Sequence, residues 1–131
     1  MRVAIISGII ILISGVLIAV ASHSSPSNTS SSKLSMATIQ SDEKAGAQLI
    51  DVRTPEEYSA GFIDSAVNIP LADIQAGQLP TVAKDKKIYL YCHSGNRAAQ
   101  AKTILQSAGY ANVTNLGGIA NVVAIGGTQI K

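Results

Sequence analysis

The only cysteine of the chain, Cys92, lies at the junction between an apolar run and a helix-forming run. Residues 87–91 alternate β-branched, aromatic and aliphatic side chains, a pattern typical of a strand buried in a sheet. Residues 98–108 are good helix formers, and the glycine after them is a helix-stop signal. The order of strand, short polar loop and helix predicts that the sulfur faces the N-terminus of a helix. Backbone N–H groups there favour the thiolate over the thiol.

Short apolar segments alternate with helix-forming segments through the rest of the chain. Strands are expected at residues 48–52, 66–69, 87–91 and 112–116, and helices at 38–45, 54–58, 71–76, 98–108 and 119–124. This order predicts an α/β fold, a small, mainly parallel sheet with helices on both faces. Ligand sites of such sheets lie at the carboxyl ends of the strands. Asp51, Arg53 and Cys92 fall at such ends, which allows them to share one rim.

The N-terminal segment differs in composition from everything that follows. Residues 3–21 contain no charged side chain, and Arg2 precedes them. Nineteen such residues can cross a bilayer as a membrane anchor, whereas the sequence Ala-Val-Ala at 19–21 fits a signal-peptide cleavage site. Residues 22–35 are expected to form a Ser-rich flexible tether and residues 36–131 the folded domain. Either reading predicts export to the periplasm, in soluble form or attached to the inner membrane through residues 3–21.

Charge and residue counts exclude several classes of partner. From residue 34 onward there are eight Lys/Arg and eight Asp/Glu residues, with one Phe and no Trp. The domain therefore lacks the excess of basic residues expected of a nucleic-acid-binding protein. A lone cysteine cannot form an intramolecular disulfide. The only other histidine, His23, lies in the tether, so His93 has no partners for a metal site, and neither a metal nor another cofactor is expected. We expect a monomer.

The spacing around the cysteine narrows the chemistry further. Four residues separate Cys92 from Arg97, and Gly95 permits a backbone turn that curls N–H groups inward. One more residue would widen the loop toward a tetrahedral phosphate, whereas the present length suits one added sulfur atom. The candidate site is therefore Cys92 with its loop residues His93, Ser94, Gly95, Asn96 and Arg97.

An ordered set of motifs over about residues 38–124 resembles the single-domain rhodaneses, which are thiosulfate sulfurtransferases, and most of all their small exported type. The matching segments are residues 49–58, 66–71, 91–99, 108–110 and 116–119. Three positions depart from the family pattern: Phe62 replaces a frequent His, Ala98 a frequent Ser, and Val122 lies near a usual Trp.

The resemblance implies a double displacement on Cys92. The thiolate would take sulfur from a small anionic donor such as thiosulfate, release sulfite, and pass the sulfur from a persulfide to cyanide or a thiol. It also implies that Arg97 binds the donor or fixes the loop, and that Asp51 and Arg53 position the loop. Each has a plainer reading: a surface ion pair for Arg97, and a strand-end carboxylate capping nearby N–H groups for the Asp51–Arg53 pair.

Other functions remain open on sequence alone. A buried structural cysteine is the plainest reading of Cys92. A non-catalytic sulfur-carrier or partner-binding module could keep the fold without its chemistry. A redox sensor is less favoured because no second cysteine could resolve a sulfenic acid, and the loop length disfavours a phosphatase. We expect Glu57 to lie on a helix surface or to pair with an arginine, and His93 to be a solvated loop residue.

Overall fold

A computed structural model describes residues 33–131 of the chain. The predicted signal peptide or anchor, and the tether up to residue 32, lie outside this range. None of the helices within residues 33–131 combines the length and the hydrophobicity of a membrane-spanning segment.

The described residues form five helices and six strands. The helices are α1 (Met36–Lys44), α2 (Pro55–Ser59), α3 (Leu71–Gln75), α4 (Asn96–Ser107) and α5 (Ile119–Ala124). The strands are β1 (Gln48–Asp51), β2 (Phe62–Ile63), β3 (Val67–Asn68), β4 (Lys87–Cys92), β5 (Asn112–Gly118) and β6 (Gln129–Ile130).

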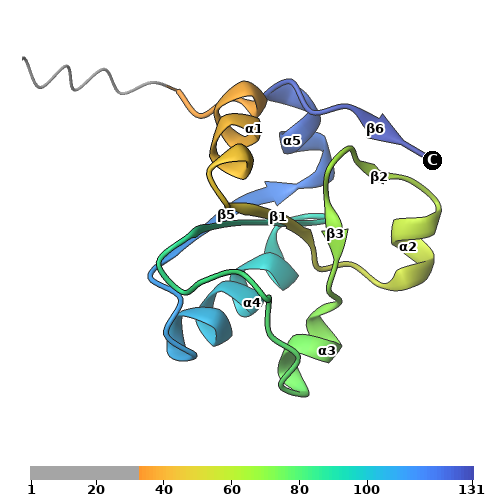
Figure 1. Ribbon diagram of the computed structural model, residues 1–131. Helices are drawn as coiled ribbons and strands as arrows, with labels where there is room; N and C mark the ends of the chain where they lie inside the picture. The colour runs from red at the N-terminus through yellow and green to blue at the C-terminus, as the bar shows by residue number, and fades with distance from the viewer. Residues whose placement is uncertain (1–32) are drawn as a thin grey trace, which may run out of the picture. The chain divides into compact units, whose positions relative to one another are not determined.

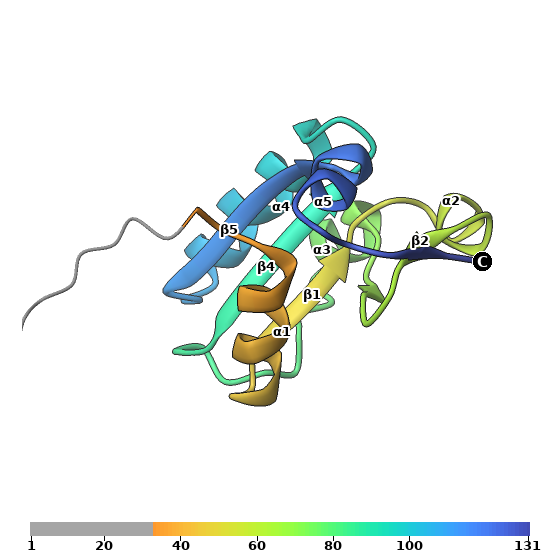
Figure 2. The same cartoon turned by 90° about the horizontal axis from the view of Figure 1, so that it is seen from above.

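The main sheet has the order β3-β1-β4-β5, and all of its neighbouring strands are parallel. This confirms the predicted α/β fold with a mainly parallel sheet. Helices α1 and α5 cover one face, and α3 and α4 cover the other (Figure 1). In Figure 2, β1, β4 and β5 lie side by side with α1 in front of them.

Each face of the sheet carries its own buried cluster. The cluster beneath α3 and α4 contains Cys92 together with Ile50, Val52, Ile88, Leu90, Ala98, Ala101 and Leu105. The cluster beneath α1 and α5 contains Met36, Ile39, Leu49, Tyr89, Tyr91 and Val122. Because successive strand residues point to opposite faces, Tyr91 and Cys92 end β4 on opposite sides of the sheet. The sulfur therefore belongs to the α4 side.

Several element boundaries differ from those expected from the sequence. Helix α1 begins two residues early because the Ser35 side chain caps it, accepting a hydrogen bond from Thr38 N at 3.3 Å. The antiparallel pair β2–β6 was not predicted, because two-residue strands are too short to show a periodicity. Strand β5 runs on through Gly118, with a register irregularity opposite the end of β4.

Candidate active site

Cys92 is the last residue of β4, and α4 begins four residues later at Asn96. Gly95 occupies the N-cap position of α4 with φ +100°, a left-handed conformation that glycine adopts without a steric penalty. No side chain caps this helix. Its first N–H groups are therefore free to bind another acceptor.

That acceptor is the sulfur. The N–H of Gly95 donates a hydrogen bond to Cys92 Sγ over 2.9 Å. Burial acts to raise the pKa of the Cys92 thiol, yet hydrogen bonds from the backbone outweigh it and bring the pKa below the ordinary value. The donating residues are Ala98, Gly95, Ser94 and Arg97. Cys92 exposes 1% of its surface, so the thiolate is stabilised by fixed dipoles rather than by water.

The β5–α5 turn packs directly against the loop and fixes its path. A Cβ added to Gly118 would collide with the carbonyl oxygen of His93, and one added to Gly95 would come within 3.1 Å of Gly117 Cα. Backbone can approach backbone this closely only where side chains are missing. The Gly117-Gly118 pair therefore leaves room for the loop that holds the sulfur.

Asn115 joins the same two segments by side-chain hydrogen bonds. Its Nδ2 donates to the carbonyl oxygen of Gly95 at 3.0 Å, and its Oδ1 accepts from Gly117 N at 2.8 Å. It thus holds Gly95, the residue whose N–H contacts the sulfur. Asn115 was not among the site residues predicted from the sequence. An asparagine two residues before a glycine is an Asx-turn signal that could have drawn attention to it.

Arg97 forms a two-pronged ion pair with Glu57 of α2. The two N–H···O distances are 2.6 and 2.9 Å. Glu57 Oε2 also accepts from the backbone N of Thr54, completing a capping box at the start of α2. Glu57 thus pairs with an arginine, which was one of the two placements expected from the sequence. Through this pair, Arg97 connects the cysteine loop to the segment after β1.

Asp51 and Arg53 form a buried pair on the other side of the sheet. Asp51 is paired in register with Tyr91, one residue before the cysteine, so its side chain points away from the Cys92 face. Arg53 Nη2 donates to Asp51 Oδ2 and to the carbonyl oxygen of Gly61, each at 2.6 Å. Asp51 also accepts from the backbone N of Arg53. These contacts correspond to the plainer reading, a strand-end carboxylate binding nearby N–H groups.

The remaining loop side chains point to solvent. His93, Ser94 and Asn96 are exposed, and Asn96 Oδ1 accepts a hydrogen bond from Gln100 one turn further along α4. Among residues 33–131, no three His, Cys, Asp or Glu side chains come together in an arrangement that could hold a metal ion.

The three positions that depart from the family pattern are accommodated by packing. The Phe62 ring stacks on Tyr58, with ring centroids 4.1 Å apart. Val122 is a residue of α5 and is fully buried. Ala98 is fully buried too, and its backbone N–H is among those that lower the pKa of Cys92.

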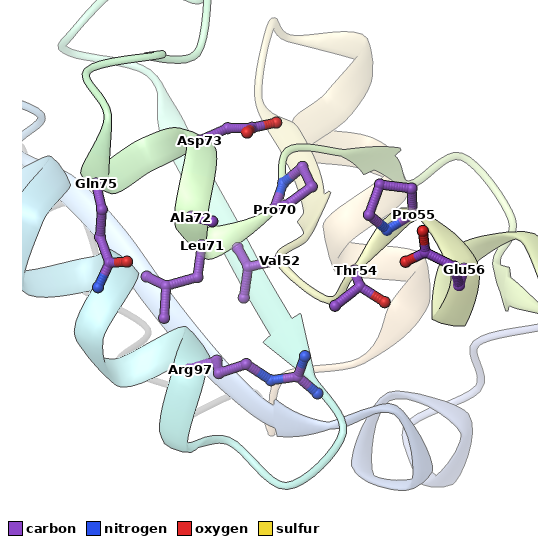
Figure 3. A pocket seen from close by; sticks show the side chains of 10 residues that line it. All are labelled: Val52, Thr54, Pro55, Glu56, Pro70, Leu71, Ala72, Asp73, Gln75 and Arg97. Atoms are coloured by element: carbon purple, nitrogen blue, oxygen red, sulfur yellow. The ribbon is translucent and has the colours of Figure 1, made fainter.

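A cavity of about 400 Å³ opens beside the loop, between the segment after β1, α3 and the start of α4. Arg97 reaches across its mouth toward Thr54 (Figure 3). Arg97 therefore contributes its backbone to the surroundings of the sulfur and its side chain to the cavity wall. The other lining residues are Val52, Thr54, Pro55, Glu56, Pro70, Leu71, Ala72, Asp73 and Gln75.

Known proteins are similar to this chain in sequence and in fold. The sequence profile of the rhodanese-like domain matches residues 36–124. Thiosulfate sulfurtransferase PspE of Escherichia coli is 38% identical over 80 residues, which are 60% of this chain and 76% of that protein. A structure described as rhodanese with anions from E. coli superposes with a TM-score of 0.55 at 35% identity, covering 65% of this chain and 98% of that one. Human single-domain sulfurtransferase TSTD1 gives a TM-score of 0.58 at 25% identity, covering 70% and 94%.

Proposed function

The chain belongs to the rhodanese-like family, and from this premise we propose that it is a sulfurtransferase that carries sulfane sulfur as a persulfide on Cys92. The donor we propose is thiosulfate or a similar small anion. The observation that carries the proposal is the set of backbone N–H groups on a buried sulfur whose pKa they lower. A thiol packed only for structure would have no need of these donors.

The chemistry is two successive displacements. In the first, the Cys92 thiolate attacks the outer sulfur of thiosulfate, a sulfur–sulfur bond forms, and the old sulfur–sulfur bond breaks to release sulfite with its electron pair. In the second, an acceptor attacks the outer sulfur of the persulfide, and Cys92 leaves as thiolate. The N–H groups that hold the thiolate serve it both as nucleophile and as leaving group.

Arg97 supports this chemistry by fixing the loop. Its guanidinium already forms a bidentate pair with the Glu57 carboxylate. Such pairs fix geometry as well as charge. We therefore assign Arg97 mainly to positioning the loop. Only the positive potential that Glu57 does not offset is available to attract an anionic donor.

Turnover tests the proposal. The protein should release sulfite from thiosulfate when cyanide is supplied, and Cys92→Ser should abolish the release. Arg97→Lys is the informative second variant, because lysine keeps the charge but cannot make the bidentate pair. A C92S protein that still released sulfite would exclude the cysteine as the sulfur carrier. A wild-type protein without turnover would favour the non-catalytic sulfur-carrier or partner-binding function.

Export is proposed on the sequence alone. Residues 3–21 lack charge and are followed by a Ser-rich stretch, which supports delivery of the domain across the inner membrane. Sequencing the N-terminus of the mature protein tests this and separates the two forms. A mature chain beginning at Ser22 indicates cleavage, and an intact Met1 on a membrane-bound chain indicates an anchor. An intact chain in the cytoplasm would contradict export.

A further inference from the structure

The cavity beside Arg97 has no assigned occupant, and its size does not suit the proposed donor. Its volume of about 400 Å³ is far more than the five heavy atoms of thiosulfate need. Cavities of about 300–1,000 Å³ generally hold small organic molecules. Arg97 links the cavity to the cysteine loop, because its backbone N–H donates toward Cys92 while its side chain lines the cavity wall.

The walls are apolar over much of their extent. Val52, Pro55, Pro70 and Leu71 line the cavity, and Val52 packs in the same buried cluster as Cys92. Pro55 is the first residue of α2, and Pro70 is the N-cap residue of α3. Each proline has a fixed φ, so this part of the wall is preorganised. An occupant with a carbon skeleton would bury apolar surface here.

The net charge of the side chains that line the cavity is negative. Glu56, Asp73 and Arg97 line it. The Arg97 guanidinium is neutralised by Glu57, at 2.6 Å. Within residues 33–131, neither the Glu56 nor the Asp73 carboxylate has an ion-pair partner or a side-chain hydrogen bond. Two free carboxylates therefore face the cavity without compensation, which disfavours an anionic occupant and favours a cationic one.

We infer that this cavity receives the organic part of the sulfur acceptor, and that the preferred acceptor is an aminothiol, a thiol that carries a protonated amine. The inference rests on the proposed function. In the step concerned, the acceptor thiolate attacks the outer sulfur of the Cys92 persulfide and a new sulfur–sulfur bond forms. The bond to Cys92 breaks, the cysteine leaves as thiolate, and the acceptor departs as a persulfide that keeps the proton. The apolar walls hold the carbon chain, and Glu56 and Asp73 attract the ammonium group.

Two small thiols of opposite charge test this inference. The full chain is loaded with thiosulfate, and kcat/KM is measured with cysteamine and with 2-mercaptoethanesulfonate as acceptors. The ratio of the two values is then compared between wild type and the double variant Glu56→Gln/Asp73→Asn, so that the intrinsic reactivities of the thiols cancel. We expect the wild type to favour cysteamine, and the ratio to fall about three- to tenfold in the variant, because each exposed charge contributes a factor of a few.

Salt and a remote carboxylate serve as controls. The preference for cysteamine should weaken in high salt, because the two carboxylates are exposed and screened. Asp85→Asn removes an exposed carboxylate that precedes β4, at the opposite end of that strand from Cys92, and should leave the ratio unchanged. The inference would be overturned by a ratio that stays the same in the double variant, or by a wild type that favours the sulfonate. In either case, turnover with cyanide would leave the proposed function intact. Absence of turnover with cyanide as well would overturn both.

Discussion

The guanidinium of Arg97 and the carboxylate of Glu57 face each other at the mouth of the site, joined by hydrogen bonds of 2.6 and 2.9 Å. The pair links the loop after β4 to the capping box that begins α2. An arginine that the sequence places beside the nucleophile is thus largely occupied by a partner 40 residues earlier. This contact fixes the loop and removes most of the positive charge that a donor would otherwise meet.

The pair should make stability depend on pH in a defined window. Hydrogen bonds from Arg97, and that from the Thr54 backbone, lower the pKa of Glu57 from 4.5 to about 2. A carboxyl group whose pKa falls on folding stabilises the protein above its unfolded pKa, and this contribution is lost as the pH falls from about 4.5 toward 2. Both side chains are about a third exposed, so we expect no more than about 1 kcal/mol.

Urea denaturation of wild type and Glu57→Gln at several pH values measures this contribution. The wild type should be the more stable at pH 7, and the difference should shrink between pH 4.5 and 2. A difference that stayed constant through this range would show that the carboxylate charge of Glu57 adds nothing to folding.

Gly118→Ala should disrupt the site by a backbone collision. Gly118 has φ −84°, which alanine adopts freely, but the added Cβ would strike the carbonyl oxygen of His93. The loop must shift, so we expect a loss of at least about tenfold in kcat/KM and about 1–3 kcal/mol of stability. The assays are sulfite release and thermal unfolding.

Gly77→Ala is the matched control. Gly77 has φ +98°, and its added Cβ meets nothing within 4 Å. It should cost about 1 kcal/mol of stability through backbone strain and leave turnover unchanged. Equal activity of the G118A and G77A proteins would exclude a role for the tight β5–α5 turn in shaping the loop.

Asn115 is predicted to position Gly95, the loop residue whose N–H contacts the sulfur. Asn115→Ala removes both of its hydrogen bonds, so the Gly95 N–H should lose its fixed direction and the pKa of Cys92 should rise. Asn115→Asp keeps the acceptor for Gly117 but adds a negative charge near the sulfur, and should raise the pKa further. The pH dependence of alkylation by iodoacetamide measures the midpoint. Lower stability with an unmoved midpoint in both variants would assign Asn115 a purely structural role.

Asp51→Ala should destabilise the fold more than it affects the chemistry directly. Arg53 exposes 6% of its surface, and Asp51 is its carboxylate partner. Removing one member of a buried pair leaves an uncompensated charge, which typically costs about 3–5 kcal/mol. Chemical denaturation measures the loss, and Asp85→Asn, at an exposed site, should change stability by less than about 0.5 kcal/mol. A small effect of D51A would mean that Arg53 finds other partners or reaches water.

Local patterns in the sequence were sufficient for the main sheet and the cysteine loop. The apolar run before Cys92 and the helix formers after it place the sulfur at a helix N-terminus, because strand and helix periodicity are encoded residue by residue. The strand order, by contrast, follows from packing of segments far apart in the chain.

Features built from distant segments could not be read in advance. The side-chain direction of Asp51 depends on its register with Tyr91, which puts it on the face opposite to Cys92. The Asn115–Gly95 contact joins residues 20 positions apart. The cavity needs three separate segments to close its walls. None of these features produces a periodic pattern of residues in the sequence.

Cys92 should carry a transferable sulfur atom. This is measured by intact-protein mass spectrometry after treatment with thiosulfate and removal of the excess. The wild type should gain the mass of one sulfur atom, peptide mapping should place that atom on Cys92, and cyanide should remove it. A wild-type protein that gains no sulfur, or a Cys92→Ser protein that gains as much as the wild type, would show that Cys92 is not the sulfur carrier.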